Sequence, residues 1–342
     1  MMSYMNRDRR FIAIILMFIL AYSCTAMAAC GGLGKKSSGY TWEKVLENQG
    51  LSLVDISILD ESNIWAIDWV DEVNGLFSKA PFFNGKGWDK QYSFEGSMLT
   101  DIYICDVPNI WAVGSYKLEE GLYPGRIFSY DGQCWQMRFE TQDKSGLISV
   151  IVLDENHVWA AGKGIYFFNG SEWSKQFESA ERLQSIYALD ADDAWAVSES
   201  GMIYHFDGSS WSEQQRLHFP NERFFISHAR MHALDESHAW AALYDTESEI
   251  TRIFFFDGSS WEEQLELPRT MVVTGIHALD EKHVWASCGN AFGKQCPILF
   301  FDGREWSIQE ECDESLIGIK ALSEDEILAV GESGSIYKGR KD

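Results

Sequence analysis

The sequence predicts an all-β protein made of seven similar units, and three recurring features support this. The pair Trp-Ala begins at Trp65, Trp111, Trp159, Trp195, Trp240 and Trp285, with spacings of 46, 48, 36, 45 and 45 residues, and Leu328-Ala329 continues the series after 43 more. An Asp stands five residues before each of these Trp, and Ser323 stands five before Leu328. An Asp-Gly or Asn-Gly pair followed by a second Trp ends the first six units. Repeats of this length without helical periodicity predict a seven-bladed β-propeller with four-stranded antiparallel blades.

The unit around residues 186–211 illustrates the four expected strands. Residues 186–189, Ile-Tyr-Ala-Leu, are apolar at alternate positions, which is typical of a half-buried strand, and the following Asp can accept a backbone hydrogen bond and open a turn. Residues 194–197 and 203–206 supply the second and third strands, and Trp211 begins the fourth. The Asp-Gly at 207–208 favours positive φ and a tight hairpin. The Asp and Ser residues of "IYHFDGSSW" are therefore interpreted as turn residues.

The two ends of the chain predict how the ring closes. The seventh unit stops at Ile336-Tyr337 and lacks a closing Trp strand, whereas Tyr40-Thr-Trp42 lies 46 residues before Trp88 of the first unit. We therefore expect the N-terminal strand to complete the last blade, so that no sheet edge stays open. Residues 40–342 form the propeller in this interpretation. Of the 14 Trp, only Trp69 has no place in the repeat.

Residues 1–29 have the pattern of a secretory signal peptide. Arg7, Arg9 and Arg10 precede an apolar run that is too short for a stable transmembrane helix, and small residues follow it. Met27-Ala-Ala-Cys30 is similar to a bacterial lipobox, which predicts lipidation of Cys30 and a flexible tether over residues 30–39. Cys24 is a second candidate, and cleavage near Ala29 without lipidation is the third. We expect a membrane-anchored lipoprotein of the bacterial cell envelope, with the propeller outside the cytoplasm.

Charge excludes several classes of partner. The whole chain carries a net charge of −24, and without residues 1–29 it has 25 Lys and Arg against 51 Asp and Glu, a net charge of −26. Phosphate backbones and anionic lipid surfaces repel such a protein. We expect no nucleic-acid partner, membrane contact only through the lipid anchor, and a monomer.

The motif "ALD…WAVG…G.I..FDG..W" resembles exported bacterial β-propellers of the BNR and YCF48-like type, over residues 40–340. The resemblance implies the propeller fold and a role in binding or assembly without catalysis. It is more distant from sialidases, because a sialidase Asp box places Asp five residues before Trp, whereas Asp207 and Trp211 are four apart. The Arg triad that a sialidase needs is also missing from the first strands, where Arg230 is the one Arg.

The first strands are expected to line the central channel, because they are the innermost strands of each blade. Their inward positions give the channel an acidic sector and a basic sector, and a small-ligand site there is one interpretation beside a solvated lining. The polar channel residues are Asp55, Asp101, Arg230, His232, His277 and Lys320.

The loops differ between the two faces of the predicted ring. Turns that join first to second and third to fourth strands keep one length, and we call this side the turn face. Loops that join second to third strands and one blade to the next vary in length, and we call this side the loop face. Variable loops on a rigid scaffold are typical of recognition. The aromatic candidates there are Trp69, Phe77, Tyr116, Tyr123, Phe219, Tyr244 and Phe292.

Cofactor, metal and cysteine chemistry gain little support from the sequence. It contains no Walker loop, dinucleotide fingerprint, His-Glu-X-X-His helix or Gly-X-Ser-X-Gly elbow, so we expect no cofactor. His157, His238 and His283 share one turn position in separate blades, too far apart for common metal ligation. Cys288 and Cys296 flank a loop between two strands, which predicts a disulfide across that hairpin.

Two functions remain open at this point. The leading hypothesis is a noncatalytic binding or scaffold protein that holds a protein or glycan of the cell envelope on its loop face. The alternative is an extracytoplasmic carbohydrate-active enzyme, a glycosidase or lyase, with Asp55 and Asp101 as paired carboxylates at the channel mouth. The carboxyl separation discriminates between them, since retaining glycosidases need about 5–5.5 Å and inverting enzymes about 6.5–9.5 Å.

Overall fold

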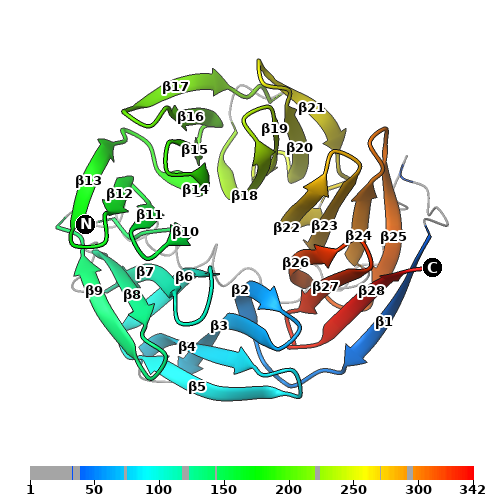
Figure 1. Cartoon of the computed structure of the whole chain (residues 1–342), viewed down its shortest axis with the longest axis horizontal. Coiled ribbons are helices and arrows are strands. Elements are labelled where there is room, and N and C mark those ends of the chain that lie inside the picture. Colours follow the sequence, from blue (N-terminus) through cyan, green and yellow to red (C-terminus); the bar gives the residue numbers. More distant parts are fainter. Residues whose placement is uncertain are drawn as a thin grey trace, which may run out of the picture.

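The computed structural model describes residues 33, 39–72, 75–117, 123–142, 145–219, 224–269, 271–290 and 296–342. These residues form 28 β-strands and no helix, arranged as seven four-stranded antiparallel sheets around a central channel (Figure 1). The predicted seven-bladed propeller is confirmed. None of the described residues belongs to a helix long and apolar enough to cross a bilayer.

The blades follow the chain order, and each runs from the channel to the rim. The first blade contains β2 (Leu53–Asp60), β3 (Asn63–Glu72), β4 (Gly75–Phe83) and β5 (Trp88–Phe94), and the second contains β6 (Ser97–Ile104), β7 (Ile110–Tyr116), β8 (Gly125–Tyr130) and β9 (Trp135–Glu140). The third blade contains β10 (Ser149–Asp154), β11 (His157–Ala161), β12 (Gly164–Phe168) and β13 (Trp173–Glu178). The fourth contains β14 (Leu183–Asp190), β15 (Asp193–Ser198), β16 (Met202–Phe206) and β17 (Trp211–Arg216). The fifth blade contains β18 (Ile226–Asp235), β19 (His238–Asp245), β20 (Ile250–Phe256) and β21 (Trp261–Glu266). The sixth contains β22 (Met271–Asp280), β23 (His283–Asn290), β24 (Cys296–Phe301) and β25 (Trp306–Cys312). The seventh contains β26 (Leu316–Ser323), β27 (Glu326–Gly331), β28 (Ile336–Lys341) and the N-terminal strand β1 (Tyr40–Leu46).

The repeated Asp at the end of a first strand makes the turn that the sequence predicted. The Oδ1 atom of Asp190 accepts the backbone N–H of Asp192 at 2.8 Å, and Asp235 accepts that of Ser237 at the same distance. Ser323 substitutes its hydroxyl, which accepts the Asp325 N–H at 3.2 Å. A short oxygen-bearing side chain is what all seven positions share, because it satisfies a donor that the tight turn leaves without a strand partner.

The Asp-Gly turns have the same local basis. Asp207 accepts the backbone N–H groups of Ser209 and Ser210 and the Ser209 hydroxyl, and these bonds lower the pKa of its carboxyl to about 2. Gly208 adopts φ of 81°, a conformation that costs side-chain-bearing residues energy. "IYHFDGSSW" is therefore a hairpin that carries a packing Trp, as predicted.

The recurrent Trp residues fill the space between blades. Trp159 and Trp285 are fully buried, and the closing Trp261 is 3% exposed. The indole N–H of Trp261 donates to Gln214 Oε1 of the preceding blade at 3.0 Å, and Trp306 donates in the same way to Gln264 at 3.2 Å. Trp211 donates likewise to Gln176, so the Gln of three Trp-X-X-Gln segments receives the Trp of the next blade, a relation between repeats that the sequence did not reveal.

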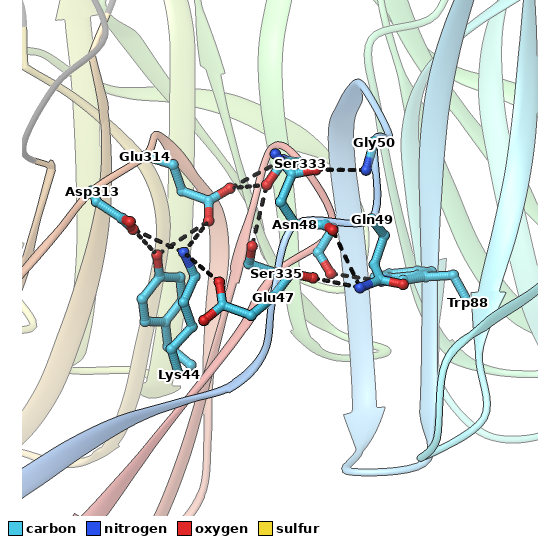
Figure 2. Close-up of polar contacts among 12 residues, drawn as sticks. Lys44, Glu47, Asn48, Gln49, Gly50, Trp88, Asp313, Glu314, Ser333 and Ser335 are labelled. Atoms are coloured by element: carbon cyan, nitrogen blue, oxygen red, sulfur yellow. Dashed lines mark hydrogen bonds and ion pairs between the residues drawn. The ribbon is translucent and has the colours of Figure 1, made fainter.

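The N-terminal strand closes the ring as predicted. β1 pairs antiparallel with β28, with Trp42 opposite Gly339 and Lys44 opposite Tyr337, so the first and last strands lie side by side (Figure 1). Figure 2 shows the polar contacts at this junction. Lys44 Nζ lies 2.9 Å from Asp313 Oδ1 and 3.3 Å from Glu314 Oε1, and the Tyr337 hydroxyl donates to both carboxylates. We call Lys44, Asp313, Glu314 and Tyr337 the closure clamp.

Candidate functional site

The channel holds a cavity of about 180 Å³ that is lined by the first strands of all seven blades. Asp55, Asp101, Arg230, His232, His277 and Lys320 all contribute to its wall, as the sequence predicted. They come together from strands that are distant in the chain, because every first strand occupies the innermost place of its blade. The chemistry of the cavity depends on which of these groups are still available to a ligand.

Asp55 is engaged on both of its oxygens. Its Oδ1 accepts Arg230 Nη2 at 2.9 Å, and its Oδ2 accepts the backbone N–H of Ile102 in the next blade at 3.0 Å. Burial raises the pKa of the Asp55 carboxyl well above its usual value, and the Asp101 charge raises it further. Both oxygens of Asp55 are therefore occupied by partners within the protein, Arg230 and the Ile102 N–H.

This geometry does not fit the predicted glycosidase pair. A catalytic carboxyl group needs an oxygen that can reach a substrate. Asp55 is only 4% exposed, and both of its oxygens already accept hydrogen bonds from Arg230 and Ile102. Asp101 Oδ2 accepts the Val150 N–H in the same way. These contacts favour a structural role for the two carboxyl groups over the catalytic pair.

The predicted basic sector contains two uncharged histidines. Burial lowers the pKa of His232 to about 4 and that of His277 well below its usual value, and the Lys320 charge lowers both further. Their rings lie 4.4 Å apart, and His232 Nε2 donates to the Ala278 carbonyl at 3.1 Å. Lys320 Nζ donates to the Ile58 carbonyl at 2.7 Å. The positive charge of this sector therefore comes from Lys320 and Arg230.

Most polar groups at the channel wall connect neighbouring blades. Asp101 Oδ2 accepts the Val150 N–H at 2.7 Å, and the Ser149 hydroxyl accepts the Ile186 N–H at 3.3 Å. Arg230 Nε donates to the Thr274 carbonyl at 2.9 Å. Each bond satisfies a backbone or side-chain group of the adjacent first strand, where no ladder partner is available. These contacts assign the channel lining a structural role between blades.

The structure partly buries the aromatic candidates of the loop face. Phe219 is buried, and Phe292 lies outside the described residues. The half-buried ones are Trp69, Phe77, Tyr116, Tyr123 and Tyr244. Arg126 lies over the Tyr116 ring, with its guanidinium carbon 3.7 Å from the ring centroid, so one face of that ring is already covered.

Trp69, the one Trp outside the repeat, is half-buried. Its ring packs against the core between the first two blades, and its N–H donates to the Leu99 carbonyl at 2.8 Å. The indole thus covers the end of the core and satisfies a backbone acceptor of the next blade. This environment favours a role of Trp69 in covering the core over a dedicated binding role.

The sequence analysis missed Phe225, an aromatic residue of the loop face that is 41% exposed. It precedes β18, and its backbone N–H donates to Asp245 Oδ1 at 3.0 Å. Asp245 is fully buried and also accepts the backbone N–H groups of Glu247 and Ser248, so one carboxylate ties two neighbouring loops together. The Phe225 ring is therefore held outward from an ordered backbone.

A stacked aromatic pair includes the residue that precedes Phe225 in the chain. The Phe219 and Phe224 rings stack with centroids 4.6 Å apart, and the buried Arg252 guanidinium lies 5.3 Å from the Phe219 centroid. Arg252 is held by Glu266 at 2.5 Å and Glu263 at 3.3 Å. We call Phe219, Phe224, Phe225, Asp245 and Arg252 the Phe225 platform. Its one clear sequence signal was the adjacent pair Phe224-Phe225 in a variable loop.

Three turn histidines have partners within their own turns. His157, His238 and His283 each place Nδ1 2.9 Å from Oδ1 of the Asp three residues earlier. Asp280, His283 and Glu324 bring ligand atoms within 4.8 Å of one another, although Glu324 is exposed and its carboxylate accepts Lys341 Nζ at 2.7 Å. The turns thus use these imidazoles to order the backbone.

The geometry argues against the predicted disulfide between Cys288 and Cys296, because their side chains face different core clusters. Cys288 packs in the core cluster between the fifth and sixth blades. Cys296 is two residues from Ile298 on β24, so both side chains lie on the same face, and Ile298 packs in the cluster between the sixth and seventh blades. The two side chains therefore lie on opposite faces of one sheet. The flanking positions in the sequence could not reveal this.

Comparisons with known proteins support the fold. Neither a family model nor a curated protein matches the chain. It is similar to the solved structure "YCF48 bound to D1 peptide", with 14% identity, a TM-score of 0.60 and coverage of 91% of this chain and 100% of that one. It is also similar to YCF48 from Cyanidioschyzon merolae, with 13% identity, a TM-score of 0.56 and coverage of 87% and 98%. A third similar structure is the WD40 β-propeller domain of Doa1, with 11% identity, a TM-score of 0.59 and coverage of 89% of this chain and 97% of that one. At these identities the likeness establishes the propeller fold.

Proposed function

We propose that this chain is a noncatalytic binding protein that holds a protein segment on its loop face through the Phe225 platform. The observation that carries the proposal is the exposed Phe225 ring, whose backbone N–H is held by the buried Asp245 carboxylate next to the stacked Phe219–Phe224 pair. An apolar group that is ordered before binding loses little conformational entropy in a complex. Aromatic anchors of this kind dominate the free energy of many protein interfaces.

Charge defines the chemistry of the partner. Glu247 and Glu249 are exposed in the loop that Asp245 ties to Phe225, and the chain as a whole carries a charge of −24. A fitting partner is a peptide segment with an apolar side chain flanked by Lys or Arg, because opposite charges favour encounter and orientation. The similar structure named "YCF48 bound to D1 peptide" gives an example of this fold holding a peptide.

The test compares two exposed apolar residues on opposite faces. Phe225→Ala should weaken partner capture from solubilised envelope about tenfold or more, since a hot-spot aromatic side chain contributes roughly 2 kcal/mol. Val107→Ala is the matched control, because Val107 is 55% exposed on the turn face. The melting temperature should be nearly unchanged in both variants. Loss of capture in the Val107 variant with full capture by the Phe225 variant would contradict the proposal.

A second readout identifies the kind of partner. The captured material is treated separately with a protease and with glycan-degrading enzymes, and the amount that still binds is measured. A protein partner is lost with the protease and survives the glycan-degrading treatment. The reverse result would overturn the choice of a protein and favour the glycan that the sequence analysis left open.

We further propose that the protein is exported and anchored through lipidated Cys30, which lies outside the described residues. The support for this proposal is the signal-like sequence over residues 1–29. Leu33, three residues after Cys30, packs against the core of the sixth blade. Cys30→Ala should move the protein from the membrane to the soluble fraction and abolish incorporation of labelled fatty acid, with Cys24→Ala as the matched control. Retained labelling in Cys30→Ala with loss in Cys24→Ala would instead assign the lipid to Cys24.

A further inference from the structure

Two buried cysteines lie opposite each other in the sixth blade. Cys296 begins β24, Cys312 ends β25, and the antiparallel register pairs them directly. Directly opposed residues of antiparallel strands have their Cα atoms about 4.5–5.5 Å apart and their side chains on the same face. Disulfides need Cα separations of about 4.4–6.8 Å, so this pair requires no backbone rearrangement.

The position of the pair links it to closure of the ring. Cys312 packs with Phe300 and Tyr337 in the core shared by the sixth and seventh blades. The next two residues are Asp313 and Glu314, which hold Lys44 of the closing strand. A covalent bond at Cys312 would therefore fix the start of the segment on which the closure clamp depends.

We propose that Cys296 and Cys312 form a disulfide that secures this segment and thereby stabilises the closed ring. The thiol environment is compatible with the bond, because Cys296 is fully buried and its sulfur makes a long hydrogen bond of 3.9 Å to the Ser315 hydroxyl. Oxidation thus replaces two buried S–H groups with an apolar link of similar size. The bond joins the third and the outermost strand of one blade.

The oxidant is a small-molecule or protein disulfide, which the compartment outside the cytoplasm supplies if the chain is exported as proposed. One Cys thiolate attacks that disulfide and releases a thiolate, and the second Cys thiolate attacks the mixed disulfide and releases the other. The two cysteines lose two electrons and two protons, and the oxidant becomes two thiols. Burial raises the pKa of Cys296 to about 11 and also raises that of Cys312, which disfavours the reactive thiolates in the folded state. The bond therefore forms before the blade packs and resists reductants afterwards.

The first experiment maps the pairing. The full chain is refolded from urea with reduced and oxidised glutathione, free thiols are blocked, and peptides are analysed by mass spectrometry. We expect Cys296 linked to Cys312, and Cys134 alkylated. Two blocked thiols at Cys296 and Cys312, or a link from either one to Cys288, would overturn the proposal. Because glutathione supplies the oxidant, the result does not depend on whether the protein is exported or binds a partner.

The second experiment measures the effect on the ring. The disulfide closes the loop that runs from Cys296 to Cys312. A bond across a loop of this length should raise the melting temperature by about 5 °C or more relative to the reduced protein. The difference should disappear in Cys312→Ala and persist in the control Cys134→Ser, whose thiol is exposed. Hydrogen exchange in β1 should be slower in the oxidised protein. Equal melting temperatures and equal exchange in the two redox states would refute the stabilising role.

Discussion

Replacement of Gly339 by Ala tests the closure of the ring at one contact. Gly339 lies opposite Trp42 across the junction of β28 and β1. A Cβ atom at residue 339 would stand 2.8–2.9 Å from three atoms of the Trp42 indole. That is well inside ordinary contact distance, so the ring must move away from the sheet. The substitution therefore strains the strand pair that closes the propeller.

The magnitude of the Gly339→Ala effect follows from two contributions. Overpacking of this kind costs about 1–3 kcal/mol, and replacement of a Gly by Ala offsets about 0.4–1 kcal/mol of it by restricting the unfolded chain. Gly339→Ala should thus destabilise by about 1–2 kcal/mol. Trp42→Ala should cost about 2 kcal/mol, roughly half the value for a fully buried Trp, because the ring is half-buried. In the double variant the clash is gone, and the total cost should stay near that of Trp42→Ala alone.

Urea unfolding of the four proteins gives the coupling free energy between the two positions. Gly87→Ala serves as the control glycine, since a Cβ there meets nothing within 4 Å. It should leave stability unchanged or slightly raised. Strictly additive costs for Gly339→Ala and Trp42→Ala would show that the indole does not lie on Gly339, and the inferred closure by β1 would lose its support at this contact.

Two further predictions concern the channel and the loop face. Burial and the Asp101 charge raise the pKa of Asp55 in the folded state above its unfolded value of about 3.9. The stability that protonated Asp55 contributes is therefore complete below about pH 3.9 and is lost as the pH rises through the folded-state pKa. Urea midpoints between pH 4 and 8 should therefore show Asp55→Asn becoming more stable relative to the wild type as the pH rises, whereas parallel profiles would contradict the raised pKa of Asp55. Glu249 adopts φ of 60°, so Glu249→Gly should raise the unfolding free energy by about 1 kcal/mol, and a lower value would contradict the backbone strain.

The functional site was harder to predict than the blades. The sequence placed Asp55, Arg230, His232 and Lys320 at the channel correctly, because their positions relative to the repeated Asp are fixed. It did not predict that Asp55 binds Arg230, 175 residues away, or that His232 is neutral. The pKa of a buried group depends on all the groups packed around it, and these come from several blades.

The exposed binding surface was also beyond the sequence. Trp69 and Phe225 both lie near variable loops and are both large aromatic residues. One covers a core and donates to Leu99, whereas the other projects from a backbone held by Asp245. Nothing in the two local sequences distinguishes these outcomes, because exposure is decided by which neighbouring segment is present to cover the ring.

The sequence by itself determined the seven blades, their turns and the closure by residues 40–46, because each depends on local signals that recur. These signals are an Asp that opens a turn, an Asp-Gly that closes a hairpin, and a Trp in fixed register. Only the tertiary structure decided which partners meet across blades. It placed Cys296 opposite Cys312 and away from Cys288, and it joined Asp55 to Arg230. The face on which a side chain lies changes with each one-residue shift in register, and its neighbours there belong to strands far away in the chain.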